Sequence, residues 1–364
     1  MRLGVIGIGD RLSGVIANAM LPADPQVRVV GVIDPDATAA RERLPERDRS
    51  EARFYRTIAE LVAGARPDAL AIGTRCDLHA PYAIEAAAFG LPIYLEKPVA
   101  NSLQQAHALE TAFAASACPV VVSFPLRVSP LCRRAKEIIT QGGIGRVEHL
   151  LATNFVPYGD VYFRSWYRDH RITQGLFLQK ATHDFDYLAF LAGSPIVRVA
   201  AMASKGRVYR DTTTRIGGEE DCEFHADIGL PETGMNEDSS SALLQFANGA
   251  QGVYTQVFFS RHRAAARGVT ISGYQATLWF DWYDNRMKRM LHREPLLEVT
   301  TPPDSSPHFG GDEVLGRNFI DVVHRRATSL APISAGLASV FACLAAKESS
   351  ESGRFVDVHQ VGFG

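Results

Sequence analysis

Cysteine is scarce in this sequence and shows no paired spacing. The five cysteines are Cys76, Cys118, Cys132, Cys222 and Cys343. An odd number of scattered cysteines, without a Cys-x-x-Cys pair, is typical of reduced thiols and indicates a cytoplasmic protein. Cys222 and His225 supply half of a tetrahedral metal set, but no second pair with ligand spacing accompanies them. We therefore predict no metal site.

Long hydrophobic runs and an excess of charge are also missing. No apolar run reaches the roughly 18 residues of a membrane helix. The N-terminus lacks the basic region, apolar core and cleavage site of a secretory signal. The 38 Lys and Arg residues against 40 Asp and Glu leave a net charge of −2, which gives no electrostatic reason to expect binding to nucleic acid or an anionic membrane. We expect neither as a partner.

What the sequence contains is enough apolar residues for two cores. At 364 residues, 46% of them hydrophobic, the chain exceeds one typical compact core. Short apolar runs in the first third predict strands over residues 3–8, 27–33, 69–72, 93–95 and 120–124. Helical patterns separate them, including 15–20 and a helix over 81–89 that Gly90 ends. This alternation predicts βαβ units and a parallel sheet.

The rest of the chain has mostly strand signals. Helices are predicted over 131–140, 178–191, 312–326 and 334–350, with Ser334 as an N-cap. Strands are predicted over 147–155, 196–202, 241–246, 253–259, 269–272 and 276–279, and a long loop over 217–240. Asn248-Gly249 between two of these strands indicates a hairpin. An antiparallel sheet with helices on one face is the expected architecture.

A glycine turn follows the first predicted strand. Gly7-Ile8-Gly9 lies between that strand and a helical run, which is the setting of a dinucleotide-binding turn, although such a pair is also a common structural turn. Its backbone would approach a pyrophosphate that the amino end of the helix holds. Leu12 stands where a third glycine is usual, and the next glycine is Gly14. We therefore expect a wider or differently packed turn.

Asp34 ends the second predicted strand. An acidic side chain there accepts hydrogen bonds from the adenosine ribose and repels a 2′-phosphate, which favours NAD over NADP. Alternatively, Asp34 only caps the helix after Pro35. Arg11 and Arg41 are nearby positive charges that would weaken the discrimination.

Glu96-Lys97-Pro98 directly follows the strand predicted over 93–95. Open α/β sheets bind ligands at the carboxyl ends of their strands. Lys97 is therefore expected to point a charge into a nucleotide site.

These motifs resemble the Gfo/Idh/MocA family, named after glucose–fructose oxidoreductase and inositol dehydrogenase. The resemblance rests on Gly7-Ile8-Gly9, Asp34, the run 72–79 and Glu96-Lys97-Pro98. It implies a doubly wound Rossmann domain over 1–124, then an α/β domain over 125–364 with a large, mainly antiparallel sheet, whose C-terminal helices pack back on the first domain. It also implies cofactor contacts from Gly7, Ile8, Gly9, Asp10, Arg11, Leu12, Asp34, Thr74, His79, Glu96 and Lys97. For His79, a purely structural role at a helix start is an equal alternative.

The resemblance implies a catalytic pair, Lys97 and His183. Lys97 would stabilise the alkoxide-like oxygen as hydride departs, and His183 would exchange the alcohol proton, because its pKa lies near working pH. Gln179, His183 and Asp186 recur at i, i+4 and i+7, so the predicted helix places them on one face. Gln179 departs from the family pattern, which has an aspartate at this place. We expect an altered charge balance or a substrate that compensates for it.

Six residues are candidates for substrate binding. They are Gln179, Lys180, Arg127, Trp166, Tyr158 and His308. Aromatic faces stack on sugar C–H surfaces, with core packing as the alternative for each aromatic residue. His308 opens a loop similar to a His-Gly-Gly-x-Asp segment of some family members. Lys180 pointing into solvent is an alternative to a site role.

The resemblance leaves three functions. The first is an NAD-dependent oxidoreductase acting on a sugar, polyol or glycoside. The second is an NAD-dependent glycoside hydrolase that works by transient oxidation, elimination and re-reduction, and the third is a non-catalytic cofactor-binding sensor. An open sheet face in the second domain predicts a homodimer or homotetramer.

Overall fold

A computed structural model describes residues 1–209, 234–302 and 307–363. The chain divides into two compact units. Unit 1 comprises Met1–Ser129, Ser305–Val340 and Val361–Gly364, and unit 2 comprises Pro130–Asp304 and Phe341–Gln360.

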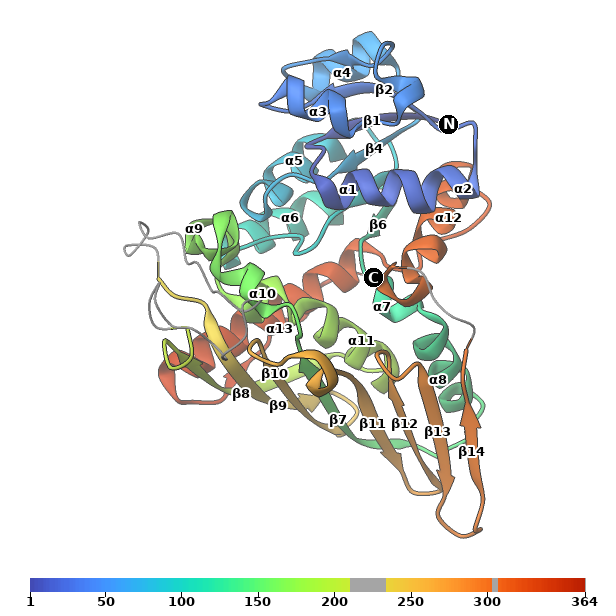
Figure 1. Ribbon diagram of the computed structural model, residues 1–364, viewed down its shortest axis with the longest axis vertical. Helices are drawn as coiled ribbons and strands as arrows, with labels where there is room; N and C mark the ends of the chain where they lie inside the picture. Colours follow the sequence, from blue (N-terminus) through green and yellow to red (C-terminus); the bar gives the residue numbers. More distant parts are fainter. Residues whose placement is uncertain (210–233, 303–306, 364) are drawn as a thin grey trace. The chain divides into compact units, whose positions relative to one another are not determined.

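Unit 1 is built on a six-stranded parallel sheet, sheet A (Figure 1). Its strands are β1 (Arg2–Ile6), β2 (Arg28–Ile33), β3 (Arg53–Phe54), β4 (Ala69–Ile72), β5 (Ile93–Leu95) and β6 (Val120–Val122). The order β3-β2-β1-β4-β5-β6 reverses direction between β1 and β4, as in a doubly wound dinucleotide-binding fold. Strands β4, β5 and β6 are buried along their whole length. The predicted Rossmann sheet is confirmed, and β3 is a strand that the sequence pattern did not indicate.

Helices connect these strands and cover the sheet. They are α1 (Asp10–Val15), η1 (Ile16–Met20), α2 (Leu21–Ala23), α3 (Ala37–Arg43), α4 (Ile58–Ala65), α5 (His79–Ala87), α6 (Leu103–Ala114), α7 (Pro125–Val128), α12 (Gly311–Val323) and the start of α13 (Ile333–Ser352). Thr57 and Ser102 cap α4 and α6 through their side chains. Ser334 does not cap α13, contrary to prediction. The helix begins at Ile333, because the carbonyl of Pro332 already accepts the first helical bonds from Ala335 and Gly336.

Unit 2 contains a nine-stranded sheet, sheet B. Its strands are β7 (Val147–Phe155), β8 (Ile196–Lys205), β9 (Glu237–Phe246), β10 (Gln251–Val257), β11 (Ala266–Gly273), β12 (Ala276–Asp281), β13 (Arg286–Leu291), β14 (Leu297–Thr300) and β15 (Val356–Asp357). The order is β14-β13-β12-β11-β7-β10-β9-β8-β15, and every neighbouring pair is antiparallel except β7 and β10. The predicted hairpin is confirmed, since β9 and β10 pair around Gly249 with φ +88°. The mainly antiparallel sheet is therefore confirmed as well.

Three parts of unit 2 differ from prediction. Strand β9 begins at Glu237, inside the loop predicted over 217–240, while Cys222 and His225 lie outside the described residues. Strands β13 and β14 were not predicted. The single helix predicted over 178–191 is two helices, α10 (Leu176–Gln179) and α11 (Thr182–Ala192), with a break at Lys180 and Ala181.

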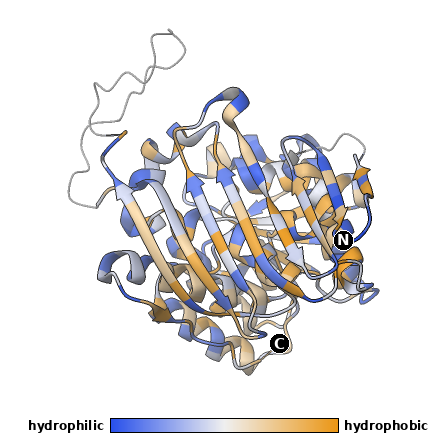
Figure 2. Ribbon diagram, turned by 90° about the horizontal axis from the view of Figure 1, so that it is seen from below, coloured by the Kyte–Doolittle hydropathy of each residue, from blue (hydrophilic) through white to orange (hydrophobic). Residues whose placement is uncertain are grey.

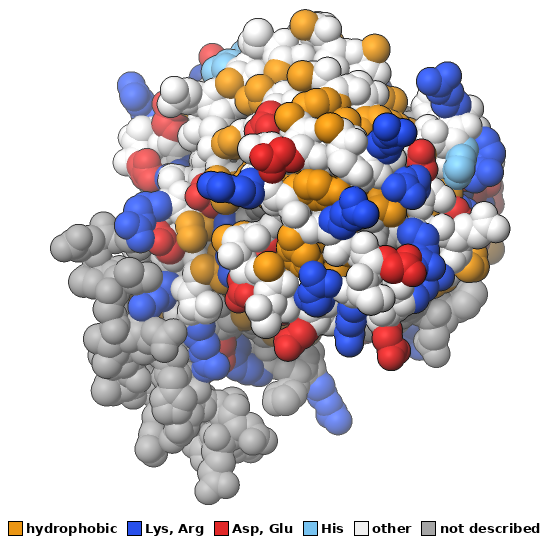
Figure 3. All heavy atoms as spheres, turned by 90° about the horizontal axis from the view of Figure 1, so that it is seen from above, with side chains coloured by type: hydrophobic (Ala, Val, Ile, Leu, Met, Phe, Trp, Pro, Cys, Tyr) orange, Lys and Arg blue, Asp and Glu red, His pale blue; other side chains and the backbone are white. Residues whose placement is uncertain are grey.

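Helices lie on one face of sheet B. These are α8 (Pro130–Thr140), α11 and residues 341–352 of α13 (Figure 1). Figure 2 looks onto the sheet from the opposite side, where the strands are exposed. Among the described residues, no helix is both long and apolar enough to cross a membrane. On the face in Figure 3, positive and negative side chains alternate with hydrophobic ones, in keeping with the small net charge.

Candidate functional site

The carboxyl edge of sheet A brings four predicted segments side by side. Backbone hydrogen bonds continue past the strand ends: Gly7 N–H donates to Ile33 O (2.8 Å) and Gly73 N–H to Ile6 O (2.9 Å). Glu96 N–H donates to Ile72 O in the same way (3.0 Å). The glycine turn, Asp34, the Gly73-Thr74 segment and Glu96-Lys97 therefore share one edge, at the point where the strand order reverses. Ligands of open α/β sheets bind in such a crevice.

The backbone of the glycine turn packs closely against Thr74 at Gly7 and is open at Gly9. Gly7 has φ +72°, and a Cβ there would lie 2.7–2.8 Å from atoms of Thr74, so no other residue fits without strain. A Cβ on Gly9 would meet only Gly73 O, at 3.9 Å. The space beside Gly9 thus leaves the backbone open to a close ligand such as a pyrophosphate.

Leu12 takes the place of the third glycine because Gly73 makes room for it. A Cβ on Gly73 would lie 2.7 Å from Leu12 Cβ and 2.8 Å from its Cδ2. Leu12 is fully buried in this contact. In the usual motif, a glycine in the helix lets the helix approach the strand closely. Here a glycine after β4 allows the same close approach.

Asp34 links the end of β2 to the glycine turn. Its Oδ2 accepts from Ile8 N–H (3.0 Å) and its Oδ1 from Asp36 N–H (3.0 Å). Asp36, not Asp34, caps α3, by accepting from Ala39 N–H. Each Asp34 oxygen keeps acceptor capacity, so its contacts leave it able to bind a ribose hydroxyl.

Lys97 follows β5 and is partly buried, while Glu96 beside it is buried. The Lys97–Pro98 peptide bond is cis. His79, the first residue of α5, lies against Pro98 O through Nδ1 (2.8 Å) and Thr74 O through Nε2 (3.1 Å). Burial lowers the pKa of His79, whereas the contacts with Pro98 O and Thr74 O oppose that effect. Through these two carbonyls the ring links the loops that follow β4 and β5.

Arg11 joins three elements of unit 1. Its guanidinium donates to both Asp312 oxygens (2.7 and 2.6 Å) and to Ser123 Oγ (3.1 Å), and lies 3.3 Å from Glu96 Oε1. Burial opposes its charge, but Glu96 and Asp312 outweigh burial and raise the pKa of Arg11. Burial also opposes ionisation of Asp312, but hydrogen bonds from Arg11 and His308 lower the pKa of Asp312 to about 2.

His308 therefore has protein partners within unit 1. Its Nδ1 lies 2.8 Å from Asp312 Oδ2 and 3.2 Å from Arg11 Nη1. His308 and Phe309 both have left-handed backbones, with φ of 51° and 56°. Non-glycine residues rarely adopt this conformation, which concentrates at functional sites. Arg127 lies on α7 of the same unit.

In unit 2, His183 lies on α11 and is buried, with 6% of its surface exposed. Asp186 lies one turn further along α11, so these two share a face. Gln179 ends α10 and does not share this helix, which corrects the predicted common face of Gln179, His183 and Asp186. At the break, Lys180 N–H and Ala181 N–H both donate to Leu176 O (3.0 and 3.1 Å), so the regular helical bonding of α10 ends there. At the start of α10, Gly175 has φ +94° and the Glu237 carboxylate accepts from Leu176 N–H.

Lys180 lies at the break between the two helices and is buried, contrary to the alternative that it points into solvent. Its Nζ donates to Tyr158 Oη (2.8 Å) and lies over the Tyr158 and Tyr162 rings. Trp166 is half-buried and stacks on Tyr167, with ring centroids 3.8 Å apart.

Several residues at these sites were not predicted. Asp312, Ser123, Asp184, Arg267 and Tyr283 complete the two clusters, and their partners lie up to 301 residues away. No local sequence signal marks such contacts. Asp184, beside His183, is the exception. A charged residue on the apolar face of a predicted helix indicates a buried group with a partner.

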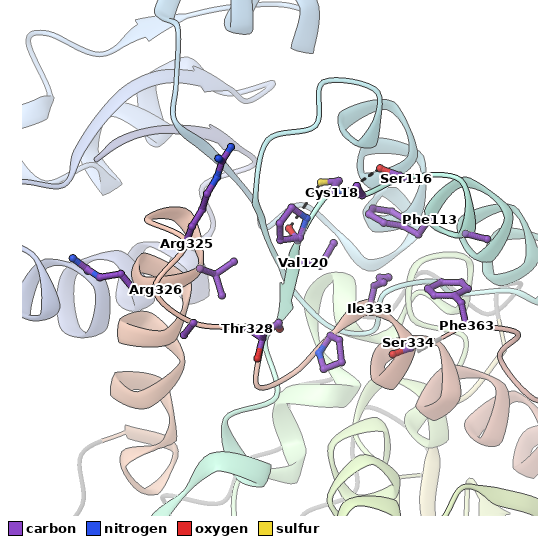
Figure 4. A pocket seen from close by; sticks show the side chains of 17 residues that line it. Phe113, Ser116, Cys118, Val120, Arg325, Arg326, Thr328, Ile333, Ser334 and Phe363 are labelled. Carbon is purple, nitrogen blue, oxygen red and sulfur yellow. Dashed lines mark hydrogen bonds between the residues drawn. The ribbon is translucent and has the colours of Figure 1, made fainter.

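A cavity of about 870 Å³ in unit 1 lies elsewhere. Phe113, Cys118, Val120, Arg325, Ser334 and Phe363 line it, among others (Figure 4). Val120 is the amino end of β6, whereas the candidate site lies at the carboxyl ends of the same parallel strands. None of the predicted site residues lines this cavity.

Two family models match the chain. "Oxidoreductase family, NAD-binding Rossmann fold" matches residues 1–124, and "GFO/IDH/MocA C-terminal domain" matches residues 132–279. Inositol 2-dehydrogenase of Rhizobium meliloti is 29% identical over 256 residues, covering 70% of this chain and 67% of that protein. The scyllo-inositol 2-dehydrogenase (NAD(+)) of Bacillus subtilis is 26% identical over 208 residues, 55% of this chain and 56% of that protein. The chain spans about half to two thirds of the length of the curated relatives it matches, 47% and 67% for two of them.

Solved structures show the same fold at low identity. Levoglucosan dehydrogenase in complex with NADH and levoglucosan superposes with a TM-score of 0.80 and 18% identity, over 99% of this chain and 100% of that one. An oxidoreductase domain protein from Kribbella flavida has a TM-score of 0.78 and 20% identity, over 98% of this chain and 99% of that one.

Proposed function

The chain belongs to the Gfo/Idh/MocA family of NAD-binding oxidoreductases, and from this premise we propose that it transfers a hydride between a nicotinamide dinucleotide and a hydroxyl or carbonyl carbon of a sugar, polyol or glycoside. Two features support a dinucleotide as cofactor: the open space beside Gly9, and the carboxylate of Asp34 at the end of β2. When bound, the nicotinamide ring exchanges two electrons and a hydrogen with the substrate carbon.

The observation that carries the proposal is the position of Lys97. It follows the buried strand β5 at the edge that also holds the glycine turn, and the buried Glu96 precedes it. An ammonium there would stabilise the oxygen that becomes alkoxide-like as the carbon is oxidised. His183 would exchange the hydroxyl proton. Pairing of Lys97 with His183 is part of the proposal.

Substrate contacts are proposed for residues of both units. Arg127 and His308 belong to unit 1, and Gln179, Lys180, Tyr158 and Trp166 to unit 2. The inositol dehydrogenases and the levoglucosan dehydrogenase among the similar proteins support a polyhydroxylated substrate. We likewise propose that the chain forms two domains, 1–124 and 125–364, and that the C-terminal helices pack back on the first domain, which the grouping of Ser305–Val340 with unit 1 supports.

We propose NAD rather than NADP as the cofactor. Asp34 places a negative charge where an adenosine 2′-phosphate would bind. Arg11 contacts Asp312 and Glu96, and Arg41 contacts Arg49 O and the Phe54 ring. Both arginines therefore contact protein groups and not a 2′-phosphate.

The test is a panel of sugars, polyols and aryl glycosides with purified protein and NAD⁺. We expect NADH absorbance at 340 nm to increase with at least one sugar or polyol. Aglycone release without net NADH would instead establish the redox-neutral hydrolase. Tight NAD binding without turnover on any substrate would favour a sensor.

A further inference from the structure

Lys180 is a buried ammonium whose hydrogen bond goes to a phenol. Only 5% of the Lys180 surface is exposed. Its Nζ donates to Tyr158 Oη at 2.8 Å and lies 4.8 Å and 5.6 Å from the Tyr158 and Tyr162 ring centroids. Cation–π contacts stabilise the charge in place, but a buried ammonium still favours a negative partner.

The carboxylate that acts on Lys180, Asp184, is already paired with another cation. Asp184, fully buried, accepts three hydrogen bonds from Arg267 at 2.9–3.1 Å. It also accepts from Tyr254 Oη and Asn154 Nδ2. In the described ranges the structure records no carboxylate in ion-pair contact with Lys180. The phenol oxygen of Tyr158 is therefore the group that compensates its charge.

Tyr158 differs from the other phenols around it. The charge of Lys180, aided by Arg267, lowers the pKa of Tyr158 to about 8 against the opposing effect of burial. Burial raises the pKa of Tyr162 and of Tyr283, which face the same group. Burial also lowers the pKa of Lys180. Asp184, Arg267, Lys180, Tyr162 and Tyr283 are thus the charged and titratable groups that act on this pair.

Tyr158 and Lys180 differ in their exposure to solvent. Tyr158 is 49% exposed, whereas Lys180 is buried behind it. Part of the Tyr158 residue is therefore open to solvent, whereas Lys180 is enclosed. A partly exposed tyrosine whose oxygen is held by an ammonium at 2.8 Å, and whose pKa is lowered to about 8, matches what proton transfer to a hydroxyl requires.

We propose that Tyr158 is an alternative acceptor to His183 for the substrate hydroxyl proton, and that Lys180 is its positioning residue, which holds the phenol oxygen ready to accept that proton. The proposal rests on the proposed oxidoreductase function and adds to it. As the substrate O–H bond breaks, the proton bonds to the Tyr158 phenolate, and the O–H electron pair becomes the second bond of the new carbonyl. The carbon-bound hydrogen leaves with its two electrons to the oxidant, a nicotinamide dinucleotide. Tyr158 then returns its proton to water.

Tyrosinate absorbance at 295 nm tests the pair without any substrate. The chain has eleven tyrosines, and we expect one ionisation step near pH 8. Tyr158→Phe should remove that step, and Lys180→Met should move it to about 10, the ordinary tyrosine value. Lys180→Arg should keep it low, because the positive charge remains.

Tyr274→Phe is the matched control, since Tyr274 is 73% exposed and lies outside this cluster; it should leave the early step in place. If Lys180→Met does not fold, tyrosine ¹³Cζ NMR of the unaltered protein still reports whether one phenol ionises near pH 8. Absence of an early step, or its persistence in Tyr158→Phe, would overturn the inference.

The catalytic role has its own readout. Tyr158→Phe should lower kcat/KM by about 100-fold or more and remove the rise of kcat/KM with pH around 8. Unchanged kinetics would overturn the catalytic role. Absence of NAD-dependent turnover in every variant would overturn the proposed function, and the catalytic role with it, while the absorbance titration would still decide for the Tyr158–Lys180 pair.

Discussion

At the scale of single residues, the charge of Asp34 is expected to set the choice of cofactor. Asp34→Ser should weaken NAD binding by about tenfold or more, because it removes hydrogen bonds to a charged acceptor, and should improve NADP binding. Calorimetric Kd values for both nucleotides measure the change. Asp34→Asn keeps a side-chain oxygen that can accept the hydrogen bond from Ile8 N–H. It should therefore remove only the electrostatic repulsion of the 2′-phosphate.

Asp36→Ser provides the control two residues away. Asp36 caps α3, and serine is also a good N-cap, so the NAD to NADP ratio should not change. An unaltered ratio in Asp34→Ser as well would mean that this carboxylate does not face the ribose.

Between elements, Leu12 and Gly73 are predicted to depend on each other. Gly73→Ala should destabilise the protein by about 1–3 kcal/mol, as overpacking does, because its Cβ would lie 2.7 Å from Leu12 Cβ. Leu12→Gly should itself destabilise the protein, because it removes a fully buried side chain, but Gly73→Ala should cost less in that background. A double-mutant cycle in urea measures this coupling. Strictly additive free energies would show that the two residues do not limit each other.

The Arg11–Asp312 contact ties α1 to α12 and should make stability depend on pH. A carboxylate whose folded-state pKa is lowered stabilises the protein above its unfolded value, here 3.8, and loses that effect as pH falls toward about 2. Asp312 is only 7% exposed. Asp312→Asn should therefore cost about 2 kcal/mol at pH 7 and progressively less below pH 4, as measured by thermal unfolding. A cost that is constant from pH 7 to pH 3 would exclude this linkage.

The elements show where sequence patterns suffice. Strands β4 and β5, which are buried throughout, and β7, which is half-buried, begin and end where the sequence pattern predicts. Burial on both faces, or exposure of part of one face, leaves a clear signal in the sequence. The break at Lys180 and Ala181 leaves none, because these residues are good helix formers. The helix that ends there is held at its start by Glu237, which accepts from Leu176 N–H and is 61 residues away in the sequence. The edge strand β14 is fully exposed and so lacks an apolar pattern.

At the scale of the whole molecule, the exposed face of sheet B is the proposed contact between copies. Register aligns Leu243, Val253 and Leu151 across β9, β10 and β7, and Leu243 and Leu151 are 51% and 44% exposed. Leu243→Asp should shift an oligomer to monomer by light scattering. Leu103→Asp, at a 49% exposed leucine of unit 1, should not. A monomeric unaltered protein would exclude this role for the sheet.

Part of the candidate site could be predicted from the sequence, because it is built from local motifs. Glycine turn, Asp34 and Lys97 are local motifs at strand ends, and the parallel sheet brings such ends together. The contact of Arg11 with Asp312 spans 301 residues, and the burial of Lys180 depends on Tyr158 and Tyr162. Neither arrangement follows from spacing along the chain.

The turnover of Lys97→Ala measures whether the ammonium at the end of β5 takes part in the reaction. With the best substrate of the panel, NADH formation at 340 nm should fall by about 10²–10³-fold or more, while the Kd for NAD changes little. Lys288→Ala, which removes a lysine lying over Trp279 in sheet B, should retain full turnover. Full activity of Lys97→Ala would contradict the account, because the ammonium at the end of β5 would then take no part in the reaction.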